Sequence, residues 1–529
     1  MRFSCTVMCL GLSLYCVGVK AQSTTPTNIL LDATVLDREG HPVVKGLTKD
    51  DFAITEDDQP EPIVSFEQPI SERDNTVGLA DDASEGGGRV ILVLDFLNSS
   101  FQDIAFIRTS VKNYLMTQPP NLTLPTEMLV LGERTLDLMH RYTRSRLELI
   151  DALDRQPPVN DDQERRNALF EGRYRYSVEA LRQIALQNRG VPGPKSIVWV
   201  GLGGPNFVVS RGIGSSSAVA AYAHETSDLL LGARMRLFVV YPGLEAQNLP
   251  HGDEEMTDAS NARAGITSAH AALKAEDPFA DNMNFGVFVK LTGGDISFGQ
   301  NDVATEIKNA VKTSRESYML SYLPSKRSED GQLRRIHVTV RNPALQLSTE
   351  AGYFAADTPT VKRVREQMVA DLTEVARSNL PFDALGMKVQ RLVRHPDTGT
   401  LDVTAMVELA KAVWKPSEHG KSATELVVAV AALGAHRDVL ASRVETQNPT
   451  AATRDGSRLV REVASIPETI HYSQKTRSVR VVIEDIESGR TGAIEFDRKV
   501  IDAAPATATP MPQLVPRFHG DIRESLPEK

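Results

Sequence analysis

The residues able to do chemistry in this sequence are scattered and do not form catalytic motifs. No His-Glu-x-x-His stretch is present to bind a catalytic zinc ion, and no Gly-x-Ser-x-Gly stretch to expose a serine nucleophile. Gly201-Leu202-Gly203-Gly204 follows an apolar run, as a dinucleotide-binding loop does, but Asn206 stands where that fingerprint needs its third glycine. His224-Glu225 and His270 fall on expected helices, where such residues are usually surface side chains. The sequence therefore predicts a protein that is not an enzyme.

The elements that position these residues alternate between apolar runs and helical spacing from about 89 to 355. Apolar runs of the kind found in strands covered on both faces occur at 90–94, 127–131, 197–200 and 235–240. Helical spacing of apolar residues recurs at 102–117, 144–153, 162–187 and 303–314. Strand-like runs at 318–322 and 335–340 end this block. Strands that alternate with helices predict an α/β fold with a doubly wound, mostly parallel sheet.

Smaller units flank this block. Residues 22–70 read as a small N-terminal β unit, and the polar stretch 71–88, which ends in three glycines, as a linker. Residues 356–380 predict a connecting helix. Short strand-like runs with turn signals at 381–503 predict a β-rich, immunoglobulin-like sandwich. The tail at 504–529 is rich in Pro, Ala and Thr, which predicts disorder.

The first residues and the composition indicate the compartment and limit the partners. Residues 1–21 have a positive start, an apolar middle and a small-x-small end at Val19-Lys20-Ala21, so we expect a signal peptide cleaved before Gln22. The mature chain would then be exported, to the periplasm or the medium, and would keep none of its three cysteines. A net charge of −10 argues against nucleic acid as a partner. No later apolar run approaches the length of a membrane span.

Several short stretches, taken in order, carry a family resemblance. The early ones are 32–43, 46–52 and 56–63, and the later ones are the Thr-Gly-Gly turn at 291–295, the Tyr-x-Leu-x-Tyr-x-Pro strand at 318–324, 335–338 and 352–355. Together they resemble a family of exported von Willebrand factor A-related proteins of acidobacteria. The resemblance implies a von Willebrand A-like domain over 89–355, followed by the β-rich tail that many members carry.

The resemblance also implies where a metal ion would bind. Von Willebrand A domains often hold Mg²⁺ at the carboxyl ends of their strands, through an Asp-x-Ser-x-Ser loop, a distant Thr and a distant Asp. In this sequence Asp95 and Ser99 match the loop, but Leu97 replaces its middle serine. Leu202 stands at the distant Asp position, and residues 157–167 contain no Thr. The expected metal ligands are therefore reduced to Asp95 and Ser99.

Such a degenerate site predicts no functional Mg²⁺ site and no other cofactor, because a hard cation takes about six oxygen ligands. Asn98 and Ser100 remain candidates for the ligand-binding face. Asn98, Ser100, Asp161 or Asp162 could each supply a further oxygen ligand, but nothing in the sequence places them at the site. The sequence favours the alternative, a structural role in which Asp95 caps the following loop or helix by accepting backbone N–H bonds.

The function expected from these features is protein–protein interaction or assembly in the cell envelope. The loop-like stretches 212–217 and 242–258 are candidate recognition segments, since connecting loops often carry binding. Two alternatives stay open. One is an exported hydrolase acting on peptide or glycan, which would need paired carboxylates in a cleft. The other is a structural envelope protein with a vestigial A domain.

Overall fold

The computed structural model describes most of the chain between residues 28 and 506. The described ranges are 28–69, 87–133, 135–157, 170–204, 207–208, 216–241, 269, 271–280, 282–298, 303–326, 330–355, 361–417, 421–452 and 463–506. The expected signal peptide, most of the linker and tail, Asp161 and Asp162 lie outside these ranges, as do the stretch 242–258 and most of 212–217. None of the helices within them combines the length and apolar character needed to cross a bilayer.

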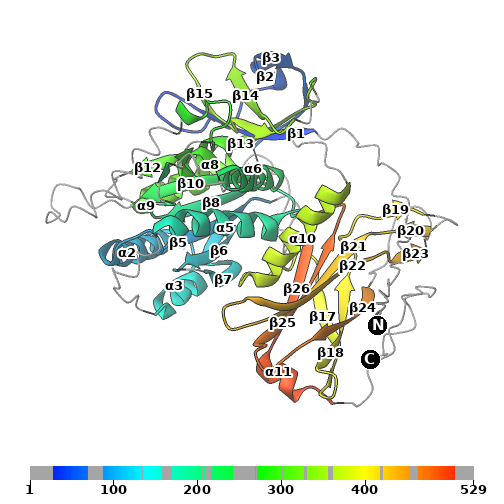
Figure 1. Ribbon diagram of the computed structural model, residues 1–529. Coiled ribbons are helices and arrows are strands. Elements are labelled where there is room, and N and C mark those ends of the chain that lie inside the picture. The colour runs from blue at the N-terminus through cyan, green and yellow to red at the C-terminus, as the bar shows by residue number, and fades with distance from the viewer. Residues whose placement is uncertain are drawn as a thin grey trace, which may run out of the picture.

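A six-stranded sheet forms the centre of the α/β domain (Figure 1). Its strands, in sheet order, are β12 (Ile296–Phe298), β10 (Met235–Tyr241), β8 (Lys195–Val200), β5 (Arg89–Asp95), β6 (Asn121–Leu131) and β7 (Leu136–Ser145). All neighbours pair in parallel except β6 and β7, which pair antiparallel. The predicted α/β class with a mostly parallel sheet is therefore confirmed.

Helices cover both faces of this sheet because successive side chains along a strand point to opposite faces. Val90, Leu92 and Leu94 of β5 join one apolar core, while Ile91 and Val93 join the other. The first core packs against α2 (Phe101–Thr117), α3 (Arg146–Arg155) and α9 (Val303–Arg315). The second packs against α5 (Phe170–Asn188), α6 (Ser216–Gly232) and α8 (Phe285–Leu291).

A separate β-sandwich, at the top of Figure 1, combines two segments that lie far apart in the sequence. One sheet has the order β15 (Gln346–Ser348), β1 (Ile29–Leu36), β13 (Ser317–Tyr322), β4 (Ile63–Glu67). The other has the order β16 (Gly352–Phe354), β14 (Leu333–Val340), β2 (Phe52–Glu56), β3 (Gln59–Glu61), with a short η1 helix (Lys49–Asp51) before β2. Their facing side chains, including Leu31, Ile54, Tyr318 and Leu320, form a core of their own.

This pairing differs from the predicted domain boundaries. The sequence analysis assigned the strands at 318–322 and 335–340 to the α/β domain and left 22–70 as a unit of its own. In the structure β13 pairs with β1, and β14 pairs with β2, so the α/β domain is inserted between β4 and β13. An apolar run indicates a strand but not its partner, and these partners lie more than 250 residues apart.

The C-terminal domain consists mainly of two antiparallel sheets packed face to face. One contains β17 (Met387–His395), β18 (Thr400–Glu408) and β24 (Val463–His471), and the other β22 (Val439–Gln447), β21 (Leu426–Leu433), β25 (Ser478–Asp485) and β26 (Thr491–Asp497). The core between them includes Leu401, Val403, Val428 and Val481. A small sheet of β19 (Lys415–Pro416), β20 (Lys421–Ala423) and β23 (Thr450–Ala452), the final α11 (Arg498–Ala503), and a ribbon of β9 (Phe207–Val208) with β11 (Asn282–Met283) complete the elements.

Helix α10 (Val361–Arg377) lies between the α/β domain and the C-terminal domain (Figure 1). Its buried residues Leu372 and Val375 belong to the same apolar core as Leu181 of α5 and Ala429 of β21. One face of the C-terminal domain is therefore covered by α10, and α10 is in turn covered by α5. The two domains share a continuous core across this junction.

The β-sandwich is joined to the α/β domain by a buried arginine. Arg236 on β10 donates hydrogen bonds to Thr34 Oγ1 at 2.7 Å, Ser317 Oγ at 2.8 Å and the carbonyl of Gly293. Arg234 forms an ion pair with Asp32 at 2.6 Å beside it. A buried guanidinium needs such partners, since removing it from water without them is costly. This junction therefore holds β1 and β13 against β10.

Glu127 gives the α/β domain a pH-dependent stability. Its side chain lies in β6 with 1% exposure, accepts one hydrogen bond from Gln187 at 3.2 Å, and has a pKa that burial raises to about 8. Between the ordinary glutamate pKa and that value, the folded chain holds a proton that the unfolded chain releases, so stability falls as pH rises. In the wild type we expect the free energy of unfolding to fall by on the order of 1 kcal/mol per pH unit between about pH 5 and 8, as measured by urea unfolding. In Glu127→Gln we expect this fall to be absent.

The exposed Glu425, changed to Gln, is the matched control for this measurement and should leave the slope of stability against pH as it is in the wild type. Equal slopes for the wild type and Glu127→Gln would contradict the assignment of this proton to Glu127.

Candidate functional site

Asp95 occupies the last position of β5, at the carboxyl edge of the central sheet. Ligands of open α/β sheets bind at this edge, and Asp95 is the residue at which the sequence analysis placed the candidate site. The side chain is fully buried, beneath the segment that follows β8 and beside the start of α2. Its surroundings therefore decide what the edge can bind.

Both carboxylate oxygens of Asp95 accept hydrogen bonds from N–H groups. Oδ1 accepts from the backbone N–H and the side-chain amide of Asn98, each at 3.0 Å. Oδ2 accepts from Asn98 Nδ2, Trp199 Nε1 and the backbone N–H of Gly203, each at 2.9 Å. A carboxylate offers about four lone-pair positions, so these donors leave it no free acceptor.

Asn98 extends this network onto helix α5. Its Nδ2 also lies 3.0 Å from Ser177 Oγ, and its Oδ1 accepts a hydrogen bond from Arg173 Nε at 3.2 Å. The Ser177 hydroxyl in turn donates to the backbone carbonyl of Arg173 at 2.9 Å. Asn98 is 3% exposed, so its amide is committed to the interior and not to an external ligand.

The two serines of the predicted ligand face have structural partners. Ser99 Oγ donates to the backbone carbonyl of Asp95 at 2.6 Å, and its side chain is buried. Ser100 is the N-cap of α2: its hydroxyl accepts from the N–H of Asp103 at 3.2 Å and donates to the Asp103 carboxylate at 2.8 Å. This reciprocal capping box satisfies donors that the first turn of a helix leaves free.

The two leucines noted in the sequence are also buried around Asp95. Leu97 is 4% exposed and Leu202 is 8% exposed, and Leu97 belongs to the apolar core on the α5 side of the sheet. Gly201 lets the segment after β8 approach Asp95 closely: a Cβ at Gly201, where φ is +146°, would lie 2.5 Å from Asp95 Cβ. Close approach of the backbone here brings the N–H of Gly203 onto the carboxylate.

The groups around Asp95 are suited to stabilising its buried carboxylate by hydrogen bonds rather than to binding a metal ion. A divalent cation needs several oxygen ligands, whereas the described groups that face Asp95 are N–H donors, whose partial positive charge repels a cation. Burial raises the pKa of Asp95, and the hydrogen bonds from Trp199, Asn98 and Gly203 oppose that shift. Within the described residues, the arrangement therefore does not match the oxygen-rich coordination that Mg²⁺ requires.

Four members of this cluster were not predicted from the sequence: Trp199, Gly203, Ser177 and Arg173. In the sequence, Trp199 stood out only as part of an apolar strand, and no motif indicated that its indole nitrogen would donate a hydrogen bond to Asp95. Ser177 and Arg173 come from α5, a helix whose sequence spacing gives no sign that it contacts the end of β5. The backbone bond from Asn98 corresponds to the capping alternative, in which Asp95 accepts N–H groups of the following loop.

No protein-family model and no curated protein matches the sequence significantly. Among solved structures, the manganese-loaded TRAP protein of Plasmodium vivax is 10% identical and covers 52% of this chain and 96% of its own, with a TM-score of 0.25. The VWA domain of SpRpn10 is 12% identical and covers 33% and 82%, with a TM-score of 0.17. CsgH of R. palustris is 11% identical and covers 23% and 98%, with a TM-score of 0.14. Scores this low carry no conclusion about function.

Proposed function

We propose that this chain is an exported, non-enzymatic protein that mediates protein–protein interaction or assembly in the cell envelope. Its α/β domain is von Willebrand A-like and engages its partner without a metal ion. The observation that carries this proposal is the environment of Asp95, whose two oxygens accept N–H donors from Asn98, Trp199 and Gly203. The resemblance of the sequence to von Willebrand factor A-related proteins supports the class.

The junctions on both sides of the α/β domain support a role as a scaffold. Arg236 and Arg234 fasten it to the β-sandwich, and Arg182 of α5 fastens it to α10. Buried ion pairs with several hydrogen bonds fix relative orientation, because shifting either partner would leave a charge uncompensated. A partner bound at the sheet edge would therefore be held at a set distance from both β domains.

The first prediction concerns metal ions. We expect calorimetric titration of Mg²⁺ or Mn²⁺ into the purified full chain to give no saturable heat, because the Asp95 oxygens are occupied by N–H donors. An Asp95→Ala variant, checked for folding by circular dichroism, should give the same result. Micromolar binding that disappears in Asp95→Ala would contradict metal-independent function.

Binding itself is tested by capture from an envelope extract of the source organism, on immobilised full chain, once with EDTA and once with Mg²⁺. We expect the same partner, retained saturably, in both conditions. A variant lacking residues 242–258 is the informative comparison, because this stretch is a candidate recognition segment in the sequence. Loss of capture in Mg²⁺-free buffer would reject metal independence, and repeated failure to retain any saturable partner would reject the interaction role.

A further inference from the structure

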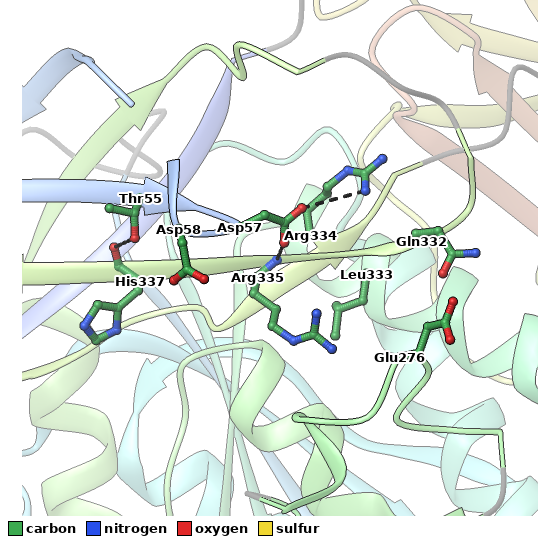
Figure 2. Close-up of a pocket in the computed structure, with 9 residues that line it drawn as sticks. All are labelled: Thr55, Asp57, Asp58, Glu276, Gln332, Leu333, Arg334, Arg335 and His337. Atoms are coloured by element: carbon green, nitrogen blue, oxygen red, sulfur yellow. Dashed lines mark hydrogen bonds and ion pairs between the residues drawn. The ribbon is translucent and has the colours of Figure 1, made fainter. Parts of the chain in front are cut away.

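A pocket of about 350 Å³ lies where the β-sandwich meets the α/β domain (Figure 2). Its walls come from the β2–β3 turn, from β14 and from the α/β segment just before α8. The lining residues are Thr55, Asp57, Asp58, Glu276, Gln332, Leu333, Arg334, Arg335 and His337. Nearly all are polar or charged and none is Phe, Tyr or Trp, so the lining suits a small charged ligand better than a stacked base or sugar ring.

The turn that forms one wall is strained at two consecutive aspartates. Glu56 pairs with Gln59, so Asp57 and Asp58 alone connect β2 to β3, and both have left-handed backbones with φ of 47° and 64°. Two-residue turns with left-handed backbones favour Asn, Asp and Gly, and glycine adopts this conformation at the lowest cost, lower than that of aspartate by up to about 1 kcal/mol at each position.

The side chain of Asp57 has partners in the structure, whereas that of Asp58 has none among the described residues. The Asp57 carboxylate accepts the backbone N–H of Arg335 at 3.0 Å and lies 3.8 Å from Arg334 Nη1. Arg334 is further paired with Asp330 at 2.6 Å. Within the described part of the chain the Asp58 carboxylate has no hydrogen bond or ion pair, although it lines the pocket.

Arg335 supplies a fixed positive charge. Its Nε donates to the carbonyl of Leu273 at 3.1 Å and its Nη2 to that of Ala275, so the guanidinium is oriented by the neighbouring domain. Among the described residues no carboxylate pairs with it, and Nη1 keeps its donors free. In the view of Figure 2 the Arg335 side chain projects between Asp58 and Glu276.

Within the described residues, the charged side chains of the pocket that have no ion-pair partner are therefore one positive and two negative groups, and all three residues are exposed to solvent. Arg335 is the positive group. Asp58 and Glu276 are the negative groups, and no hydrogen bond or ion pair of Glu276 occurs within the described ranges. A ligand that matches this set carries one anionic and two cationic groups. That is the charge pattern of a basic α-amino acid, and a volume near the small end of ligand sites fits one such molecule.

We propose that this pocket binds a free basic α-amino acid of the lysine or arginine class. Its α-carboxylate pairs with Arg335, and its two cationic groups pair with Asp58 and Glu276. The site is independent of the sheet edge at Asp95 and does not rest on the interaction role proposed above. Because its walls come from both domains, an occupied pocket would also strengthen their contact.

The test is calorimetric titration of L-lysine and L-arginine into the full chain, with L-norleucine, which lacks the side-chain charge, and acetate as comparison probes. We expect dissociation constants of about 0.1–1 mM for the basic amino acids, and binding of L-norleucine weaker by roughly tenfold. Glu276→Gln should remove the preference for L-lysine over L-norleucine. Equal affinity for both probes in the wild type would overturn the assignment of a basic ligand.

Asp58→Gly separates binding from folding. Glycine relieves the left-handed strain at φ 64°, so this variant should be more stable than the wild type in thermal unfolding while losing at least tenfold in affinity for L-lysine. Unchanged affinity in both Asp58→Gly and Glu276→Gln would reject the site. The absence of any heat from L-lysine and L-arginine up to about 10 mM, roughly ten times the weakest expected dissociation constant, would also reject the site.

Discussion

Replacing Arg182 by Met is expected to destabilise the chain by about 3–5 kcal/mol, the largest loss that we expect from any single side chain outside the cores. Arg182 is 2% exposed and pairs with Asp371 and, at 3.0 Å, with Glu374, both on α10. Its guanidinium also lies 4.9 Å from the centre of the Tyr222 ring. Met fills a similar volume but leaves the Glu374 carboxylate without its cation and leaves Asp371 with Arg189 as its remaining partner.

The loss should begin at the junction with the C-terminal domain. Arg189 continues the same network, joining Asp371 at 3.2 Å to Glu484 of β25 at 2.5 Å. The chain has two tryptophans, Trp199 in the α/β domain and Trp414 in the C-terminal domain, so a Trp414→Phe background reports the α/β domain alone. Urea unfolding is followed by tryptophan fluorescence in the chain with both tryptophans and in the Trp414→Phe background. With Arg182 present, we expect the two unfolding transitions to coincide. With Arg182→Met, we expect them to occur at different urea concentrations.

Arg155→Ala is the matched control, because Arg155 pairs with Asp151 four residues away on α3 and both side chains are largely exposed, at 70% and 65%. Exposed pairs of this kind contribute at most about 1 kcal/mol. If Arg182→Met cost no more than Arg155→Ala, the junction would have to be held by its apolar contacts alone.

Gly294→Ala is expected to destabilise the α/β domain by about 3 kcal/mol or more. Gly294 lies in the Thr292-Gly293-Gly294 turn between α8 and β12, and a Cβ placed on it would lie 1.7 Å from the carbonyl oxygen of Leu237 on β10. That atom is backbone in the middle of the sheet, so it cannot move aside as a flexible side chain does. The turn must retreat from β10, which also weakens the bond from the N–H of Leu237 to Thr292 Oγ1 at 3.1 Å.

Gly232→Ala, at the end of α6, is the control for this substitution. No atom lies within 4 Å of the position of its Cβ, and alanine is favoured over glycine in helices, so this variant should equal or exceed the wild type in stability by up to about 1 kcal/mol. Thermal unfolding of the two variants side by side makes the comparison. A Gly294→Ala variant as stable as Gly232→Ala would show that the close packing of this turn on β10 is not required.

The sequence predicted strands β5, β6, β8 and β10 of the central sheet because their signals are local, but it did not predict β7, β12 or α8. The continuous apolar run at 90–94 and the helical spacing at 102–117 and 303–314 need no knowledge of neighbours to be recognised. The parallel sheet and its two helical layers follow from their alternation, and both are present. The position of Asp95 at the carboxyl edge follows from the same reasoning.

Partners across long distances were decided only by the tertiary structure. The strand at 318–322 has the same apolar pattern whether it ends the central sheet or pairs with β1, and only packing places it beside Ile29–Leu36. The pocket at Asp58 and Arg335 arises from that pairing, since it needs β2, β14 and residue 276 together. No spacing in the sequence connects these three segments.

The sequence by itself determined that Asp95 follows a buried strand, and the family resemblance implied few oxygen donors beside it, because Leu97 and Leu202 stand at two of the expected ligand positions. Only the fold decided which groups surround Asp95. The indole N–H of Trp199 and the N–H of Gly203, from the end of β8 and the residues after it, converge on one buried carboxylate with the amide of Asn98, which follows β5. A buried charge must find donors from whatever surrounds it, and those surroundings are set by packing rather than by order along the chain.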